Sequence, residues 1–418
     1  MELDTEQQQA IHLCCDVTKR VVAVTGQAGS GKTTIIRLVH EHFTKAGYSV
    51  VLAAPTGKAA KRIQEATGVT AITVHRLLQY SHPGDPDPKT GKPMGISAPR
   101  RDRDNPIGYD VVIIDEYAMV NTEVHRNLFD AIKSGGLVRL FGDLNQLKPI
   151  EETVVLKEKP SPFQQMLEKM PSVRLLTNHR QIEGSGIIEN ALLINKGMMP
   201  RRRNDFNMIV TDSPVARLKQ LIEERAAQGI HYNALDNQVL TPTNKGWIGT
   251  HALNGMMQLM YLDNDRLLLT LPRHEWLKKL GIICRVQAGS KVIYTSNNYG
   301  LEVFNGETGI VSEITDYGEI VLDLGDREVV VPPEQSYVNQ YGKTVFFDPR
   351  KDIDLAYAIT THKSQGSEYG HITYVLNKSI AFMQGRKNTY TAVTRARKHV
   401  DFIADQRSLS VCVQPGKL

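Results

Sequence analysis

A glycine-rich segment near the amino terminus has the residue types needed to hold a phosphate chain. It reads GQAGSGKT over Gly26–Thr33 and follows the β-branched run Val21–Val24. Its glycines permit a tight loop whose backbone N–H groups point at phosphate oxygens, while Lys32 can reach the terminal phosphates and the Thr33 hydroxyl can ligate Mg²⁺. The residues expected to contact a nucleotide here are Gly26, Gln27, Ala28, Gly29, Ser30, Gly31, Lys32, Thr33 and Thr34.

An acidic pair further along the chain could complete such a site. The run VVIIDE, Val111–Glu116, ends on Asp115 and Glu116 after an apolar stretch. Asp115 would hold Mg²⁺ through water, and Glu116 could accept the proton of an attacking water molecule. Together with the glycine-rich loop, this pair predicts the hydrolysis of a nucleoside triphosphate.

Short apolar runs that alternate with helical stretches would position these groups. Ile35–Lys45, for example, has an apolar face typical of a helix. Strands alternating with helices predict a parallel, doubly wound α/β sheet. The runs expected to form its buried strands are Val21–Val24, Val50–Ala54, Val111–Asp115, Val138–Phe141 and Val173–Leu176.

The rest of the chain divides into three kinds of segment. Ser81–Pro106 is rich in Pro, Gly and charge, and predicts either a flexible loop or a small β-hairpin insertion. Residues 184–256 and 351–418 again mix helices and strands. Between them, residues 281–333 show short alternating strands separated by turn signals such as Asn305-Gly306, which predicts a small β-barrel inserted into a second α/β domain.

Composition limits the classes of protein that remain. The chain has 418 residues, 41% of them hydrophobic and 23% charged, which excludes a disordered or collagen-like chain and predicts two or three domains. No apolar run is long enough for a membrane span, no secretory signal is evident, and the four cysteines form no CxxC pair. These features predict a cytoplasmic location. The net charge of +5 is too small to identify a polyanionic partner.

Further motifs lie before, between and after the two described above, in an order that can be recognised. They are LDTEQQQAI near the amino terminus, APTGKAAKRI, TVHRLL, GDLNQLKPI, LLTNHRQ, TTHKSQGSEY and NTYTAVTRARKHV. This order resembles superfamily 1 DNA helicases of the 5′-to-3′ branch, the RecD-like and Dda-like enzymes, over Leu3 to Val400. The resemblance implies two RecA-like P-loop motor domains with parallel sheets, residues 1–175 and residues 176–256 with 350–418. It also implies a pin-like insertion at 80–107 and an SH3-like β-rich insertion at 257–349.

The resemblance gives nucleotide roles to residues outside the glycine-rich loop. It implies that Gln7 recognises adenine and that Gln146 senses the γ-phosphate. Arg180 and Arg395 would come from the second motor domain and donate hydrogen bonds to the charge that develops on the γ-phosphate in the transition state. ATP would then bridge the two domains, and its hydrolysis would loosen them, which couples hydrolysis to movement.

Three of the motifs, APTGKAAKRI, TVHRLL and TTHKSQGSEY, resemble segments that contact DNA in this family. Hydroxyls, backbone N–H groups and lysines that hold phosphates give binding that is largely independent of base sequence. Gln365 and Glu368 would instead face the nucleotide, and helix capping is a structural alternative for Thr73. The residues that the resemblance assigns to DNA are Pro55, Thr56, Lys58, Thr73, His75, Thr361, His362, Lys363 and Ser364.

The resemblance therefore implies an ATP- and Mg²⁺-dependent helicase that moves 5′ to 3′ on single-stranded DNA and separates duplex DNA. An alternative is a DNA-stimulated translocase that remodels protein–DNA complexes or junctions with little unwinding, because Ser81–Pro106 contains no aromatic residue to act as a wedge. A non-catalytic single-strand-binding module is a second alternative, and RNA remains open as the strand. The implied partners are single-stranded DNA, its junctions with duplex, and replication or recombination proteins, with the chain acting as a monomer away from membranes.

Overall fold

The computed structural model describes most of the chain in two compact units. The first comprises Met1–Ile182 with Val338–Thr344, and the second comprises Glu183–Tyr337 with Val345–Leu418. Most of the segment expected to form a pin-like insertion lies outside the described residues. The described residues are 3–80, 99–149, 159–177, 185–261, 269–270, 285–298, 300–338, 344–379 and 385–415.

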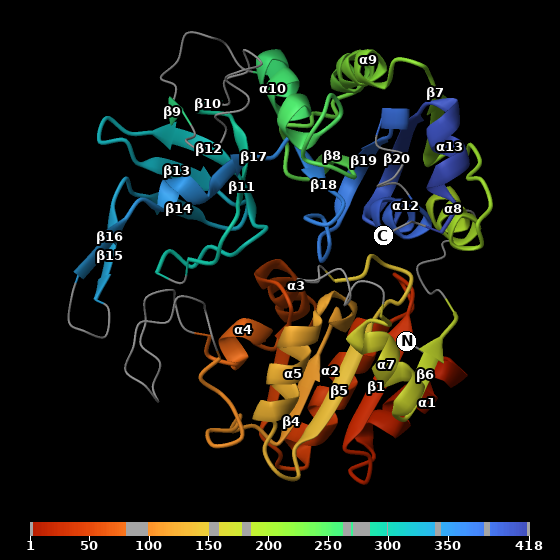
Figure 1. Ribbon diagram of the computed structural model, residues 1–418, viewed down its shortest axis with the longest axis vertical. Helices are drawn as coiled ribbons and strands as arrows, with labels where there is room; N and C mark the ends of the chain where they lie inside the picture. Colours follow the sequence, from red (N-terminus) through yellow and green to blue (C-terminus); the bar gives the residue numbers. More distant parts are fainter. Residues whose placement is uncertain are drawn as a thin grey trace. The chain divides into compact units, whose positions relative to one another are not determined.

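The first unit is built on a six-stranded sheet in the order β3-β2-β4-β5-β1-β6 (Figure 1). Every neighbouring pair in this sheet is parallel, as the alternation of apolar runs and helical stretches predicted. Its elements are α1 Thr5–Cys15, β1 Val21–Gly26, α2 Lys32–Lys45, β2 Val50–Ala54, α3 Gly57–Thr67, β3 Ala71–Thr73, α4 Val74–Leu77, β4 Val111–Ile114, the 3₁₀ turn η1 Tyr117–Met119, α5 Thr122–Ala131, β5 Leu137–Gly142, α7 Pro162–Lys169 and β6 Ser172–Leu175.

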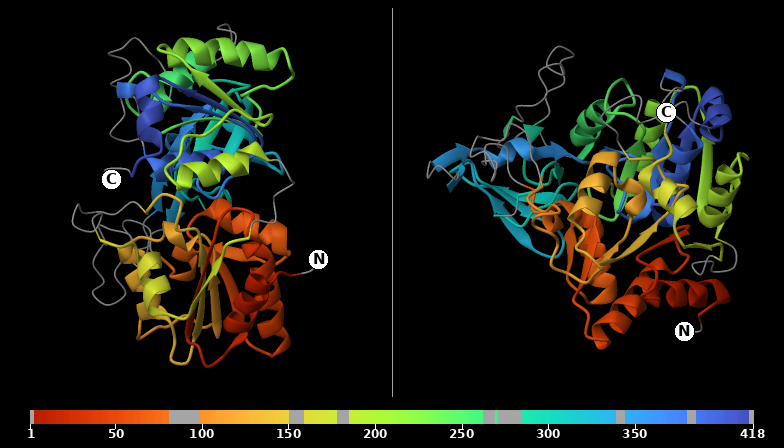
Figure 2. Two further views of the ribbon diagram at one scale, coloured as in Figure 1. Left: turned by 90° about the vertical axis from the view of Figure 1, so that its right-hand side faces the viewer. Right: turned by 60° about the horizontal axis from the view of Figure 1, so that its bottom comes forward.

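Helices cover both faces of this sheet. One apolar cluster joins α1, α2 and α3 to the sheet, and a second joins α4, α5 and α7 to it. The left view of Figure 2 shows the red helices near the amino terminus and the yellow α7 on opposite sides of the strands. Successive residues of a strand point to opposite faces, so Ile113 packs in the first cluster and Ile114 in the second. A strand buried on both faces needs a continuous apolar run, which is why strands such as Val50–Ala54 and Val111–Ile114 were visible in the sequence.

The second unit contains a five-stranded parallel sheet in the order β18-β8-β19-β20-β7. Helices α8, α12 and α13 pack on one face and α9 and α10 on the other. The elements that build this layer are α8 Gly186–Asn195, β7 Phe206–Val210, α9 Pro214–Ala226, β8 Asn237–Thr241, α10 Thr250–Tyr261, β18 Ala358–Thr360, β19 Tyr369–Val375, α12 Arg386–Val393, β20 Ala396–Ala404 and α13 Gln406–Cys412.

An antiparallel sheet in the order β14-β13-β12-β11-β17 lies within the same unit, where the sequence predicted short alternating strands. Its identification as an SH3-like barrel remains a prediction. The remaining elements are β9 Leu269–Thr270, β10 Arg285–Val286, β11 Lys291–Tyr294, β12 Thr308–Ile314, β13 Ile320–Asp323, β14 Glu328–Val331, β15 Gln335–Val338, β16 Thr344–Phe347, the 3₁₀ turn η2 Pro349–Asp352 and β17 Ile353–Leu355.

Two buried polar side chains connect the antiparallel sheet to the parallel one. Lys291 on β11 is fully buried, and its ammonium donates to Ala234 O at 2.8 Å and Asn237 O at 2.6 Å, just before and at the start of β8. Asn254 on α10 donates to Leu355 O and accepts from Ala358 N, at the end of β17 and the start of β18. Buried polar groups are costly unless they are hydrogen-bonded, so these contacts specify how the two sheets meet.

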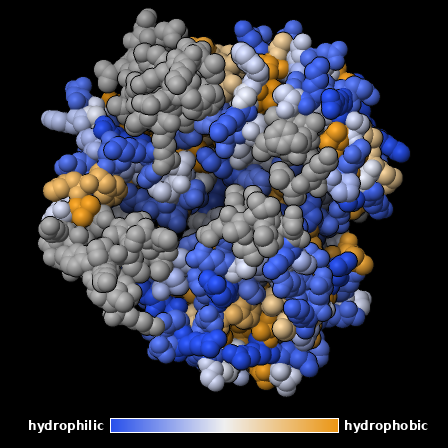
Figure 3. Space-filling model, viewed as in Figure 1, coloured by the Kyte–Doolittle hydropathy of each residue, from blue (hydrophilic) through white to orange (hydrophobic). Residues whose placement is uncertain are grey.

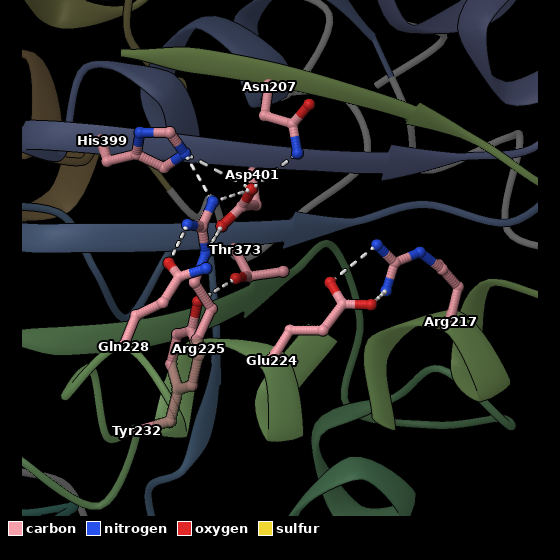
Figure 4. Close-up of polar contacts among 9 residues, drawn as sticks. All are labelled: Asn207, Arg217, Glu224, Arg225, Gln228, Tyr232, Thr373, His399 and Asp401. Atoms are coloured by element: carbon pink, nitrogen blue, oxygen red, sulfur yellow. Dashed lines mark hydrogen bonds and ion pairs between the residues drawn. The ribbon is translucent and has the colours of Figure 1, made fainter. Parts of the chain in front are cut away.

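A buried carboxylate joins α9 to strands β7 and β20 (Figure 4). Asp401 is 1% exposed, and the Arg225 guanidinium donates to both of its oxygens, at 2.8 and 2.6 Å. Asn207 on β7 donates to Asp401 Oδ1 at 3.0 Å. Burial works to raise the pKa of Asp401, but side-chain hydrogen bonds from its neighbours outweigh burial and hold the pKa at about 2.

We predict that Asp401→Asn destabilises the protein at neutral pH. The folded pKa lies below that of the unfolded chain, so the stabilisation from Asp401 is fully present above about pH 4 and is lost as the pH falls toward 2. The variant should lose about 2–3 kcal/mol of unfolding free energy at pH 7, and the deficit should shrink toward pH 2. Denaturant unfolding at several pH values measures this.

Glu224→Gln is the matched control because Glu224 pairs with Arg217 on the same helix but is 52% exposed. An exposed pair contributes less than about 1 kcal/mol, so this variant should unfold almost like the parent protein. Equal losses in the two variants would contradict the role given to Asp401.

No helix within the described ranges has the length and apolar composition needed to cross a membrane.

Candidate functional site

The glycine-rich loop turns from the end of β1 into the start of α2, as its position in the sequence predicted. Gly29 and Gly31 have φ values of 85° and 82°, in the left-handed region that favours glycine. Gly26 is required for a different reason, because a Cβ at this position would clash with the Ser30 side chain. The Lys32 ammonium donates to Gly26 O at 2.7 Å and Gln27 O at 3.0 Å, so the lysine folds back over its own loop.

The acidic pair lies directly after β4. Asp115 is 9% exposed and Glu116 is 8% exposed. Burial, and next to it the charge of Glu116, raises the pKa of Asp115 to about 6, although Lys32 acts in the opposite direction. The influence of Lys32 shows that the P-loop lysine and the acidic pair are neighbours in space. Glu116 has a φ of 50°, which is strained for a residue with a side chain and directs the chain into η1.

Strand β5 delivers a third group to the same edge of the sheet. It lies between β4 and β1, and the segment Asp143–Gln146 follows its carboxyl end. Asp143 accepts from Asn145 N at 2.9 Å, which forms a tight turn and presents the buried Gln146. Ligands of parallel α/β sheets bind at the carboxyl ends of the strands, so this edge is the candidate active site.

Three buried polar atoms in these segments form no hydrogen bond with any described residue. They are Ser30 Oγ in the P-loop, Glu116 Oε2 after β4 and Gln146 Oε1 after β5. More than nine in ten buried polar groups in native proteins are hydrogen-bonded. Three of the nine such atoms in the described part of the chain lie in three separate segments at this one sheet edge, where a polar ligand would satisfy them.

Helix α1 places Gln7 against the P-loop. Asp4 caps the helix and exchanges hydrogen bonds with Gln7, and Gln7 Nε2 donates to Ser30 O at 3.3 Å. The other end of α1 is held by Arg139 on β5, which is fully buried. Its guanidinium donates to Cys14 O at 2.5 Å and Lys19 O at 3.0 Å, among other carbonyl oxygens. Arg139 therefore fixes the helix that carries Gln7.

Sequence reasoning did not identify Arg139 or Asp143 as part of the site. The signal for Arg139 was its position, because a single arginine inside the apolar run LVRLFG must enter a buried sheet. A buried guanidinium requires several acceptors and so joins distant segments.

The donors at this edge fit Mg²⁺ that is held partly by a substrate. Mg²⁺ in phosphate-transfer sites takes one or two protein oxygens together with water and phosphate oxygens. The Thr33 hydroxyl and the Asp115 carboxylate could supply those protein oxygens. The described residues contain no cluster of three or more His, Cys, Asp or Glu side chains, so they provide no cage made of protein ligands alone.

In the second unit, the segment Thr361–Glu368 follows the carboxyl end of β18. Thr361 N donates to Thr241 O at 3.0 Å, which joins this segment to the neighbouring strand β8. The Thr361 and Ser364 side chains are fully buried, and Ser364 Oγ donates to Thr361 O. Lys363 is partly exposed and lies 4.0 Å from Asp354, while burial lowers the pKa of His362. Of the group assigned to DNA, Thr361 and Ser364 therefore serve at least to shape the loop.

Arg395 is buried between α12 and β20, with 2% of its surface exposed. Its guanidinium donates to Thr391 O, Ser367 O and Thr394 Oγ1 at 3.2–3.4 Å, and no carboxylate among the described residues forms an ion pair with it. The bond to Ser367 O connects it to the segment that carries Gln365 and Glu368. The other arginine of the predicted site, Arg180, lies outside the described residues.

The DNA candidates of the first unit follow strands β2 and β3. Thr56 caps α3 by accepting from Ala59 N at 3.3 Å, and Thr73 caps α4 by accepting from Arg76 N at 3.1 Å. The structural alternative considered for Thr73 is therefore correct for the described conformation. Burial lowers the pKa of His75, whose ring packs against Tyr80 with centroids 4.7 Å apart. Pro55 and Lys58 flank the cap of α3.

Comparison with known proteins agrees with this arrangement. Residues 2–211, half of the chain, match the family model described as an AAA domain. The chain belongs to this AAA-domain family. Residues 355–403, from β17 to β20, match the UvrD-like helicase C-terminal domain. Together with the relatives below, these matches confirm that the chain is a superfamily 1 helicase relative of the 5′-to-3′ branch.

Two relatives illustrate how far the similarity extends. The ATP-dependent RecD2 DNA helicase of Deinococcus radiodurans is 31% identical over 384 residues, which covers 90% of this chain and 46% of RecD2. The RecBCD enzyme subunit RecD of Mycobacterium tuberculosis is 26% identical over 447 residues, which covers 98% of this chain and 70% of RecD. The chain thus spans about half the length of the RecD2 relative.

Solved structures of Pif1 helicases share the fold of this AAA-domain protein. Pif1 from Candida albicans has a TM-score of 0.59 at 18% identity and covers 100% of this chain and 98% of its own. Bacteroides Pif1 in complex with ADP-AlF₃ and single-stranded DNA has a TM-score of 0.55 at 20% identity and covers 98% and 94%. The chain therefore has the parallel-sheet α/β fold of P-loop helicases.

We predict that Asp115→Asn stabilises the nucleotide-free protein at alkaline pH. The folded pKa of about 6 exceeds that of the unfolded chain, so protonated Asp115 favours folding below about pH 4 and this contribution is lost as the pH rises through 6. The neutral amide should add about 1–3 kcal/mol of unfolding free energy at pH 8 and nothing at pH 4. Denaturant unfolding at both pH values, without nucleotide or Mg²⁺, measures this.

Asp110→Asn is the control for that prediction. Hydrogen bonds from Lys133 and Ser49 lower the pKa of Asp110, so its substitution should reduce stability at pH 8 or leave it unchanged. A gain of the same size in both variants would mean that Asp115 has no special environment.

Proposed function

We propose that this chain is an ATP-dependent DNA helicase that moves 5′ to 3′ along single-stranded DNA and separates duplex DNA. The observation that carries the proposal is the set of unpaired polar atoms, Ser30 Oγ, Glu116 Oε2 and Gln146 Oε1, at the P-loop edge of the first sheet. They occur in a chain whose other sheet matches a UvrD-like helicase domain. The activity named for RecD2, and the single-stranded DNA and ADP-AlF₃ bound by Bacteroides Pif1, support the substrate assignment.

In this proposal the first unit binds and hydrolyses ATP. The backbone N–H groups of the P-loop and the Lys32 ammonium would bind the phosphates, and Gln7 would recognise the adenine. Mg²⁺, held by Thr33 and Asp115, would neutralise charge on the phosphate oxygens. The Glu116 carboxylate would accept the proton of the attacking water, and the Gln146 amide would respond to the γ-phosphate.

The second unit would supply the arginines and part of the DNA path. Arg180 and Arg395 would stabilise the transition state, and Gln365 and Glu368 would report the state of the nucleotide. DNA phosphates would be bound by the backbone and hydroxyl groups of the β2, β3 and β18 loops, with Lys58 and Lys363 contributing charge. Such contacts do not distinguish bases, which movement along a strand requires.

The domain boundaries and accessory elements belong to the same proposal. Residues 1–175 and residues 176–256 with 350–418 would form the motor domains, 80–107 the pin and 257–349 the SH3-like insertion. Replication or recombination proteins and a monomeric state are further expectations.

We predict that the purified chain unwinds a duplex with a 5′ single-stranded tail in the presence of ATP and Mg²⁺. A duplex with a 3′ tail should remain double-stranded under the same conditions, because a protein that moves 5′ to 3′ along a 3′ tail moves away from the duplex. Gel or fluorescence separation of the strands, with ATP hydrolysis recorded in parallel at several salt concentrations, measures both. Unwinding of only the 3′-tailed duplex would contradict the proposed 5′-to-3′ direction of movement.

Arg395→Ala and Arg397→Ala form a matched pair for this assay. Arg395 is buried, whereas the Arg397 side chain is 51% exposed and pairs with Asp236. Loss of an arginine that acts on the γ-phosphate costs about 10³-fold or more in kcat, so Arg395→Ala should be inactive and Arg397→Ala nearly normal. Lys32→Ala should also be inactive, and hydrolysis by it would refute the nucleotide site.

Replacement of residues 81–98 by a short Gly/Ser linker separates unwinding from translocation. Arg100 N and Arg101 N both donate to Leu78 O at 3.1 Å, so the ends of this segment lie close together and a linker can join them. We predict that the variant keeps DNA-stimulated ATP hydrolysis and loses strand separation. Unchanged unwinding would place the separating element elsewhere, and a parent protein that translocates without unwinding would favour the remodelling alternative.

A further inference from the structure

The loop between β8 and α10 presents a tryptophan to solvent. Residues 244–247 are exposed, while Thr243 and Ile248 on either side are buried. The Trp247 side chain is 81% exposed, although an indole is among the most favourable groups to bury. The face in Figure 3 is largely hydrophilic with separate apolar patches. The exposed residues beside Trp247 in the loop are Asn244, Lys245 and Gly246, so the loop itself presents no other apolar side chain.

Hydrogen bonds hold this loop in one shape. Thr250 N donates to Thr243 O at 3.0 Å, Thr250 Oγ1 donates to Asn244 Oδ1 at 2.9 Å, and Thr241 Oγ1 donates to Ile248 O at 2.8 Å. A Cβ on Gly249 would lie 2.5 Å from the backbone oxygens of the facing turn, so only glycine fits at that position. Preorganisation of this kind lowers the entropic cost of binding, because the backbone that carries the indole is already ordered.

The loop lies beside a segment already assigned to DNA. Strands β8 and β18 are parallel neighbours, with Thr241 opposite Thr360, so the loops after their carboxyl ends leave the same edge of the sheet. Thr361 N donates to Thr241 O at 3.0 Å and connects the two loops directly. Lys245 is exposed two positions before Trp247, and residues 242–250 contain no acidic side chain.

We propose that Trp247 is a stacking platform for a base of single-stranded DNA, with Lys245 contacting the adjacent phosphate. The inference rests on the proposed function, because it extends the path expected from Thr361–Ser364. Every base has a face that can stack on an indole, so this contact would add affinity without sequence preference. A nucleic acid strand presents the π-face of a base next to a phosphate. Trp247 can stack on the base, and the nearby Lys245 can pair with the phosphate.

Tyr317 provides a comparison within the same unit. It is 84% exposed in the turn between β12 and β13, but it follows the acidic residue Asp316. An adjacent carboxylate would repel a phosphate chain. Tyr317→Ala therefore removes an equally exposed aromatic side chain from a site that is unsuited to DNA.

Affinity for a dT oligonucleotide and for a strand of abasic sites of equal length tests the proposal. Trp247→Ala should bind the dT strand about 5- to 100-fold more weakly than the parent, and Trp247→Phe should stay within about threefold of it. On the abasic strand the parent and Trp247→Ala should bind equally, because no base remains to stack. Tyr317→Ala should match the parent on both strands, and Lys245→Ala should reduce the dependence of binding on salt.

Fluorescence gives an independent readout. The chain has two tryptophans, so Trp276→Phe leaves Trp247 as the only one, and its emission should be quenched by the dT strand but not by the abasic strand. Equal dT affinity of Trp247→Ala and the parent would overturn the inference, as expected if Trp247 instead contacts a protein. A parent protein that binds no single strand at all would overturn the proposed function itself.

Discussion

Parallel pairing of the strands is the constraint on which the candidate site depends. Parallel strands bring all their carboxyl ends to one edge of a sheet, so a loop after any strand reaches that edge. In the first unit, β5 lies between β4 and β1, and the P-loop, the acidic pair and the Gln146 turn therefore converge although they are far apart in sequence. In the second unit the same geometry brings the loops after β8 and β18 together.

Buried cations hold the helices and sheets around these edges in position. Arg139, Lys291 and Arg395 are all nearly or fully buried, and each donates to backbone carbonyl oxygens. A carbonyl oxygen accepts a hydrogen bond without bringing a second charge into the interior, so the cost of desolvating a carboxylate is avoided. Because the guanidinium has five donors, one arginine can join several segments, as Arg139 does for α1 and β5.

The sequence revealed those parts of the fold and site that depend on local pattern. Strands buried on both faces produce apolar runs, and Val50–Ala54 has the predicted bounds. Short strands such as Ala71–Thr73 and Ala358–Thr360 were missed because three residues carry too little periodicity and form only beside an existing strand. The role of Thr73 as a helix cap was also local and was considered from the sequence.

Other features required long-range contacts and could not be read from a pattern. Arg139 reaches carbonyl oxygens more than a hundred positions earlier in the chain, and the Asp401 network joins β7, α9 and β20. No motif of the sequence pointed to Trp247, because its exposure depends on the path of the surrounding loop. The effect of the acidic pair on stability likewise depends on burial, which sets the pKa of Asp115 and which no motif specifies.

Two buried carboxylates of this molecule, Asp401 and Asp115, differ in their hydrogen-bond partners and in their roles. Asp401 receives donors at both oxygens, and its pKa is accordingly low, as expected for a group whose task is to hold three elements together. Asp115 is buried beside another carboxylate, and its pKa is high. Such an arrangement opposes folding, and it persists in proteins where a positively charged ligand offsets the repulsion during function. The energetic conflict lies next to the P-loop lysine, at the sheet edge where unpaired buried atoms also occur, so stability and sequence motifs independently identify the same site.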